Sequence, residues 1–71
     1  MKSNNGKYLK EMGAKIQAAR KAKGLSIRQF AAMCSMDFSN LNRLENGQKD
    51  CHILSLKTIA EALKVDVKDL L

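Results

Sequence analysis

The sequence has no proline, three aromatic residues, two cysteines and no long apolar run. The lack of proline, with β-branched residues only scattered, favours a bundle of short helices. No segment approaches the ~18 apolar residues of a membrane-spanning helix, and the amino terminus is polar rather than signal-like. We therefore expect a cytoplasmic protein with no membrane partner. Its 71 residues suffice for one domain.

The residues that commonly bind metals or perform catalysis are few. Cys34 and Cys51 are widely separated, without a C-x-x-C pair, and His52 is the only histidine. This spacing argues against a zinc site, and we expect both thiols to be reduced, with Cys34 in the core. No nucleophile–base set is visible. The sequence thus predicts a protein that is not an enzyme and has no metal, cofactor or evident small-molecule ligand.

The positive charge is concentrated at one end of the sequence. Residues 1–24 contain seven basic residues and one acidic residue, whereas residues 25–71 contain six of each. The whole net charge of +6 therefore lies in the amino-terminal third. Such a field attracts a polyanion. A solvated, lysine-rich first helix explains the charge equally well.

The apolar spacing predicts a compact all-α bundle of five short helices. The first should occupy about residues 7–23 and end at Gly24, after a flexible segment (residues 1–6) with a possible cap at residues 3–5. A fourth helix should begin near Ile53 or Ser55. A fifth, barely two turns long, should follow a cap at Asp66 and complete a domain covering residues 7–71.

The second and third helices have clear start and stop signals on either side of a tight turn. Ser26, with Gln29 three residues later, predicts a capping box for the second helix. Asp37 caps the third helix, and Asn46-Gly47 ends it. The pair covers about residues 26–45 and matches a helix-turn-helix, which places its second helix in the major groove of DNA.

Two charged residues fall on the apolar sides of these helices. Arg20 lies about 40° from the centre of the apolar stripe of the first helix, and Glu45 lies about 40° from Leu41 in the third. Because a charge directed toward the core needs a partner, we infer an Arg20–Glu45 ion pair that joins the two helices. Two unrelated surface charges are the alternative.

The outer side of the third helix carries polar groups. Ser39 and Arg43 point outward on adjacent turns, flanked by Asn40 and Asn42. Arg43 is the strongest candidate for reading a base, because arginine bonds guanine N7 and O6 together. Phe38 either contacts a thymine methyl or folds down against its own core.

Residues 13–71 resemble the Cro/C1-type (Xre-like) helix-turn-helix family. The resemblance rests on Ile16…Arg20…Lys23-Gly24-Leu25-Ser26, Phe30-Ala31, Leu41…Arg43-Leu44-Glu45-Asn46-Gly47 and Ile59-Ala60…Ala62-Leu63…Val65…Leu70-Leu71. It implies a lambda-repressor-like DNA-binding domain whose third helix enters the major groove. The family often has glycine where this chain has Ser35, so we expect some strain in the turn.

The resemblance also implies two groups of DNA contacts. Base edges should be contacted by Asp37, Phe38, Ser39 and Arg43, to which the helical geometry adds Asn40 and Asn42. Phosphates should be contacted by Ser26, Arg28, Gln48 and Lys49.

Together these features predict a sequence-specific transcriptional regulator, a repressor, that binds a pseudo-palindromic operator in double-stranded DNA as a homodimer. The expected pairing surface is Val67, Leu70 and Leu71. A restriction–modification controller protein and the antitoxin of a toxin pair are alternatives within DNA binding. A protein-interaction module without DNA binding is the alternative of another class.

Overall fold

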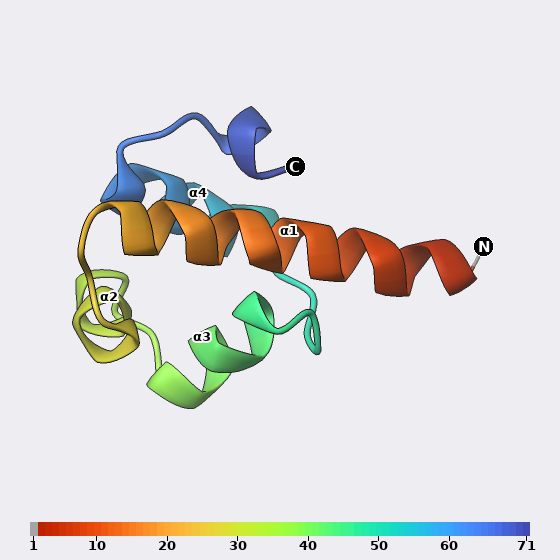
Figure 1. The fold of residues 1–71 in the computed structure, drawn as a ribbon, viewed down its shortest axis with the longest axis horizontal. Helices are drawn as coiled ribbons and strands as arrows, with labels where there is room; N and C mark the ends of the chain where they lie inside the picture. The colour runs from red at the N-terminus through yellow and green to blue at the C-terminus, as the bar shows by residue number, and fades with distance from the viewer. Residues whose placement is uncertain (1) are drawn as a thin grey trace.

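A long helix, α1 (Lys2–Ala22), forms the axis around which the other elements pack. The computed structural model describes residues 2–71, with side chains from residue 6 onward. The other elements are α2 (Ile27–Met33), α3 (Phe38–Glu45), α4 (Ile53–Leu63) and a short 3-10 helix, η1 (Val67–Leu70). In Figure 1, α2 and α3 lie below α1, whereas α4 and η1 lie behind and above it. The helix-turn-helix is thus held on one side of a rigid rod.

The ends of α2 and α3 follow from local hydrogen bonds that the sequence predicts. The amide of Gln29 donates to Ser26 Oγ at 3.1 Å, and the amide of Ser26 donates to Gln29 Oε1 at 2.8 Å. This capping box satisfies two amides that the first turn leaves without partners. At α3, the amide of Ser39 donates to Asp37 Oδ2 at 3.2 Å. Both predicted caps are confirmed.

The turns use left-handed backbone at a few positions. Gly24, which follows α1, has φ of 71°, as its predicted role at the helix end requires. Ser35, between α2 and α3, has φ of 54°. A side chain makes this conformation unfavourable, so the strain expected from serine at the turn position is present.

The beginning of α1 differs from the prediction. The helix starts at Lys2 rather than near Lys7. Once the later turns are formed and packed, each added residue gains a backbone hydrogen bond, and Gly6 costs only about 1 kcal/mol. Met1 and the side chains of residues 2–5, including the possible cap at residues 3–5, lie outside what the structure describes.

The carboxyl-terminal part also differs from the predicted five helices. Residues 2–71 contain four α-helices, and the expected fifth is the 3-10 helix η1. Asp66 precedes it, and its amide donates to Asp69 Oδ2 at 3.3 Å. The predicted capping interaction is therefore present. Four residues are too few to establish α-helical bonding, and short segments commonly adopt the tighter 3-10 form. Of the two starts considered for α4, the structure has Ile53.

The core lies between α1, α4 and the helix-turn-helix. Its buried side chains are Met12, Ile16, Phe30, Ala31, Cys34, Leu41, Leu44, Leu56, Ile59, Ala60, Leu63 and Leu70. Cys34 is among them, as predicted, and burial raises the pKa of its thiol. Within residues 2–71, no helix has the length and apolar character needed to span a membrane.

Candidate nucleic-acid interface

A buried ion pair fixes α3 to α1. Arg20 Nε donates to Glu45 Oε2 at 2.7 Å, and a terminal guanidinium nitrogen donates to Oε1 at 3.1 Å. The other terminal nitrogen donates to the carbonyl of Leu25 at 2.7 Å, in the connection to α2. Arg20 and Glu45 are 8% and 5% exposed. This is the pair inferred from their positions in the sequence, and it holds α1, α3 and the start of the helix-turn-helix together.

A glycine allows α1 and α3 to come close together. A Cβ atom on Gly13 would collide with the carbonyl oxygen of Leu44 and lie 2.6 Å from that of Glu45. Only a residue without a side chain fits this crossing. We did not predict this contact from the sequence. The available signal was a glycine inside a helix, where it costs stability unless packing requires it.

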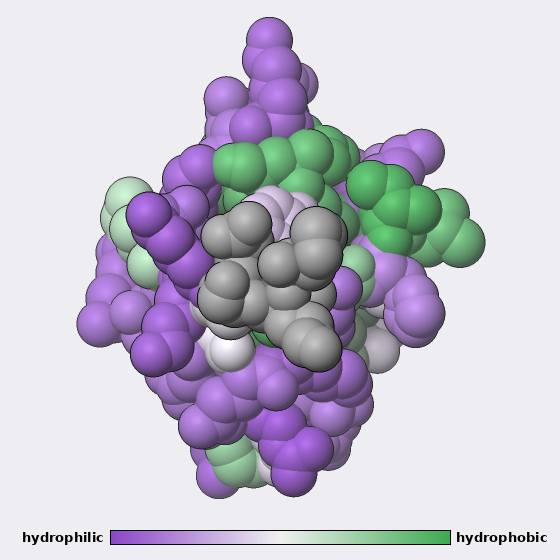
Figure 2. Space-filling model, turned by 90° about the vertical axis from the view of Figure 1, so that its right-hand side faces the viewer, coloured by the Kyte–Doolittle hydropathy of each residue, from purple (hydrophilic) through white to green (hydrophobic). Residues whose placement is uncertain are grey.

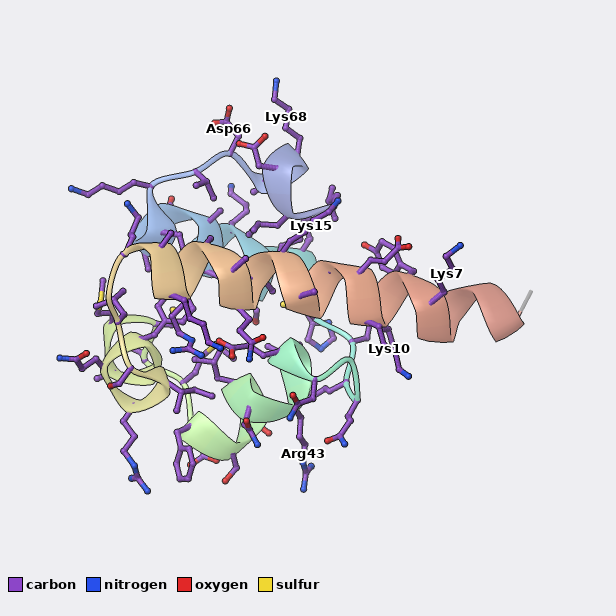
Figure 3. All side chains as sticks on the ribbon, viewed as in Figure 1. Lys7, Lys10, Lys15, Arg43, Asp66 and Lys68 are labelled. Carbon is purple, nitrogen blue, oxygen red and sulfur yellow. The ribbon has the colours of Figure 1, made fainter. Side chains whose placement is uncertain are left out.

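The outer face of α3 presents the predicted polar side chains to solvent. Ser39, Asn42 and Arg43 are exposed, and Asn40 is half-buried. Figure 3 shows Arg43 pointing away from α1 and from the body of the molecule. These side chains therefore share one accessible helix face.

Asp37 has a second, structural task at this face. The residue is exposed, but its Oδ2 atom accepts the amide of Ser39 at the start of α3. A carboxylate that caps a helix is held in one orientation, and its second oxygen can accept a further hydrogen bond.

Arg28 and Phe38 contact each other across the turn. The guanidinium carbon of Arg28, on α2, lies 4.2 Å from the centre of the Phe38 ring. Phe38 is 38% exposed, so it lies at the boundary between the two arrangements that the sequence left open. A cation–π contact at an exposed site contributes about 0.5–1 kcal/mol. Sequence reasoning missed the pair, because no helical periodicity extends across a turn.

The expected phosphate contacts lie on both flanks of α3. Ser26 and Arg28 are exposed at the start of α2, and Gln48 and Lys49 are exposed after α3. The backbone amide of Gln48 donates to the carbonyl of Arg43 at 2.9 Å, which closes the end of α3. That amide is therefore unavailable to a phosphate, whereas the side chains of Gln48 and Lys49 are exposed and available for the role.

The expected pairing surface needs a correction. Leu70 is only 2% exposed because it packs into the core of its own chain, so it is unavailable at the surface. Val67 is half-buried, and Leu71 is 48% exposed. Among the side chains that the structure describes, the most exposed large apolar ones are Ile53 and Leu54, at the start of α4, which are 60% and 72% exposed. Figure 2 views the molecule from the end at which α1 begins. It shows hydrophobic surface in the upper part of that view and a mostly polar surface below it.

A tight turn joins α2 to α3, and the buried ion pair fixes α3 to α1 with its polar face outward. This arrangement is typical of a DNA-binding helix-turn-helix domain. A family model described as "Helix-turn-helix" matches residues 16–70. This chain belongs to that family, the Cro/C1-type helix-turn-helix proteins, and the resemblance stated from the sequence is confirmed. The family's members are DNA-binding regulators.

Solved structures of regulators share the fold. The restriction–modification controller protein C.AhdI from Aeromonas hydrophila is similar with a TM-score of 0.86 and 28% identity, over 89% of this chain and 96% of that one. The clp gene regulator ClgR from C. glutamicum is similar with a TM-score of 0.86 and 27% identity, over 89% of this chain and 81% of that one. The DNA-binding domain of BldD has a TM-score of 0.84 and 26% identity, over 93% and 96%. No curated protein matches the sequence.

Proposed function

We propose that this protein is a sequence-specific transcriptional repressor without enzymatic activity, which acts in the cytoplasm as a homodimer on a pseudo-palindromic operator. The observation that carries the proposal is the exposed polar face of α3, which the buried Arg20–Glu45 pair holds outward. A recognition helix must be accessible and rigid, because small displacements break bidentate bonds to base edges.

Arg43 is the residue to which we assign direct reading. Its side chain is exposed and points away from the body of the molecule (Figure 3). A guanidinium in the major groove is suited to guanine, through N7 and O6. Ser39 and Asn42 share its face and offer further donors and acceptors, and Asn40 and Asp37 border it. Phe38 is partly exposed, and an aromatic side chain suits contact with a thymine methyl.

The side chains on either side of α3 are assigned to the DNA backbone. Ser26 and Arg28 are at one end of the reading unit, and Gln48 and Lys49 are at the other. Contacts on both flanks would set the depth and angle of the helix in the groove, because phosphates fix register and carry little sequence information.

Two copies are proposed because one helix-turn-helix contacts only a few base pairs. Symmetric half-sites about 34 Å apart would let both recognition helices bind successive turns of one groove. Exposed apolar side chains at Ile53, Leu54 and Leu71 support pairing of two copies through apolar contacts. A dimer bound in this way would repress by occupying the DNA.

A restriction–modification controller is a second candidate for the biological role. It is favoured by the similarity to C.AhdI, which extends over 96% of that chain. Both roles use the same DNA-binding face. The operator and its genomic neighbours would distinguish them.

The test is selection of bound sequences from a random pool of duplexes, with the mass of the complex measured in solution. We expect a two-fold symmetric consensus and two chains per duplex. Replacement R43A should then lose about 1–3 kcal/mol of binding and relax one base preference. The control K68A removes a charge on the opposite side of the molecule (Figure 3) and should bind normally.

Salt dependence separates DNA binding from the interaction-module alternative. Binding that neutralises phosphates weakens steeply as salt is added. Apolar docking to a protein does not. If the purified protein binds none of the duplexes tested at low ionic strength, the proposal is contradicted.

A further inference from the structure

The family model matches only the carboxyl-terminal third of α1. The family match begins at residue 16, whereas α1 begins at Lys2. Figure 1 shows the amino-terminal end of α1 projecting beyond the other helices, past the end of α3. Its basic residues include Lys7 and Lys10, and they contribute to the positive charge of the amino-terminal third. None of them was assigned a role from the sequence.

Lys10 lies directly against the loop that follows α3. Gly47 has φ of 73°, and a Cβ atom on it would lie 2.7 Å from Lys10 Cα and 2.6 Å from Lys10 Cγ. The backbone of α1 therefore contacts the loop one residue before Gln48 and two before Lys49. The side chain of Lys10 is exposed. The Lys10 side chain therefore begins beside the loop that contains Gln48 and Lys49, the two residues expected to contact phosphates there.

The directions of the side chains separate Lys10 from its neighbour Lys7. Figure 3 shows Lys10 on the lower side of α1, the side that carries α3 and Arg43. The Lys7 side chain, about 60° away around the helix axis, extends upward and away from α3. The helix supplies a matched pair of lysines, three residues apart, of which one faces the reading side.

The two lysines of this edge form no ion pair within the described side chains. Among residues 6–71, whose side chains the structure describes, the one ion pair joins Arg20 to Glu45. Lys10 and Lys49 therefore have no carboxylate partner within those residues. Asp50 follows Lys49 in the loop, and its Oδ1 atom accepts a hydrogen bond from the amide of Cys51 at 2.7 Å. Glu11 is rotated about 100° from Lys10 around the helix axis.

We propose that Lys10 is a DNA-backbone contact that extends the phosphate-binding edge beyond Lys49 along α1. The inference rests on the proposed function. When α3 enters the major groove, base edges face its tip, and the phosphates of the flanking strands lie beside it and further back. Lys10 lies in such a position relative to Arg43, because both side chains are on the same side of α1 and Lys10 is the nearer of the two to that helix (Figure 3). The contact adds affinity and no base preference.

The test compares K10Q with K7Q in the full chain, because both remove one charge from one helix. Binding of a fluorescent duplex is measured by anisotropy over a series of potassium chloride concentrations, with the selected sequence and with an unrelated one. K10Q should reduce the slope of log K against log salt by about 1 on both duplexes. The base preference should stay unchanged, and K7Q should keep the slope of the parent protein.

Equal slopes for K10Q and the parent protein would overturn the inference and leave the proposed function standing. Equal losses in K10Q and K7Q would also overturn it, because they would indicate net charge rather than a contact. The absence of duplex binding by the parent protein would instead contradict the proposed function. Thermal unfolding followed by circular dichroism checks that both variants are folded.

Discussion

Arg20 on α1 and Glu45 on α3 form a buried, two-bonded ion pair across 25 residues of sequence. A third bond, from Arg20 to the carbonyl of Leu25, ties the same guanidinium to the connection before α2. One side chain therefore joins the supporting helix to both parts of the helix-turn-helix. The orientation of the outward face of α3 depends on this junction.

Removal of one member of the pair should destabilise the domain strongly. E45A leaves the guanidinium of Arg20 buried without its partner, which costs about 3–5 kcal/mol. Urea unfolding, followed by circular dichroism, measures the loss. The double variant R20M/E45L is the control, since it removes both charges together and should be more stable than E45A. A double variant no more stable than E45A would contradict the stranded-charge explanation.

Replacement of Gly13 by alanine should destabilise, although alanine is the better helix former. At an ordinary helical position the change stabilises by about 1 kcal/mol. At Gly13 the new methyl group would collide with the carbonyl oxygens of Leu44 and Glu45, and backbone cannot move aside cheaply.

Gly6 supplies the control for this prediction. It lies in the same helix, and nothing is within 4 Å of a Cβ atom placed on it. G6A should therefore stabilise by up to about 1 kcal/mol, with the opposite sign to G13A. Thermal melts of the two variants under one set of conditions make the comparison. Equal shifts of Tm would show that α1 and α3 do not cross as closely as described.

Replacement of Ser35 by glycine should stabilise the domain. Ser35 has φ of 54°, a conformation that costs a side-chain-bearing residue roughly 1–2 kcal/mol. Glycine removes that cost but loses more entropy on folding, so the expected net gain is about 0.5–1 kcal/mol. S35A keeps the unfavourable conformation and should give no such gain. An unchanged urea midpoint in S35G would contradict the strain.

Much of the fold follows from short-range signals in the sequence. The capping box at Ser26 and the cap at Asp37 were predictable because each involves atoms only two or three residues apart. The Arg20–Glu45 pair is a long-range contact, yet it was predictable because each charge stands alone on an apolar side of its helix. A misplaced charge is informative because burial demands a partner.

Other features depend on packing that no local signal reveals. The burial of Leu70 follows from how η1 folds back on α1 and α4, and a pattern of leucines cannot distinguish core from surface. The Gly13 crossing and the Arg28–Phe38 contact join elements whose relative positions are set by the whole bundle. The polar face of α3 was predictable as a face. The assignment of individual contacts within it remains a prediction.

The placement of α1 between Arg43 and η1 has a genetic consequence. Arg43 lies on one side of this helix, and η1, which leads to Leu71, lies on the other. Under the proposed pairing, a chain that has lost Arg43 would still associate with intact copies. Each mixed dimer would have one intact and one altered DNA-binding face. The altered allele would therefore interfere with the normal one when both are expressed.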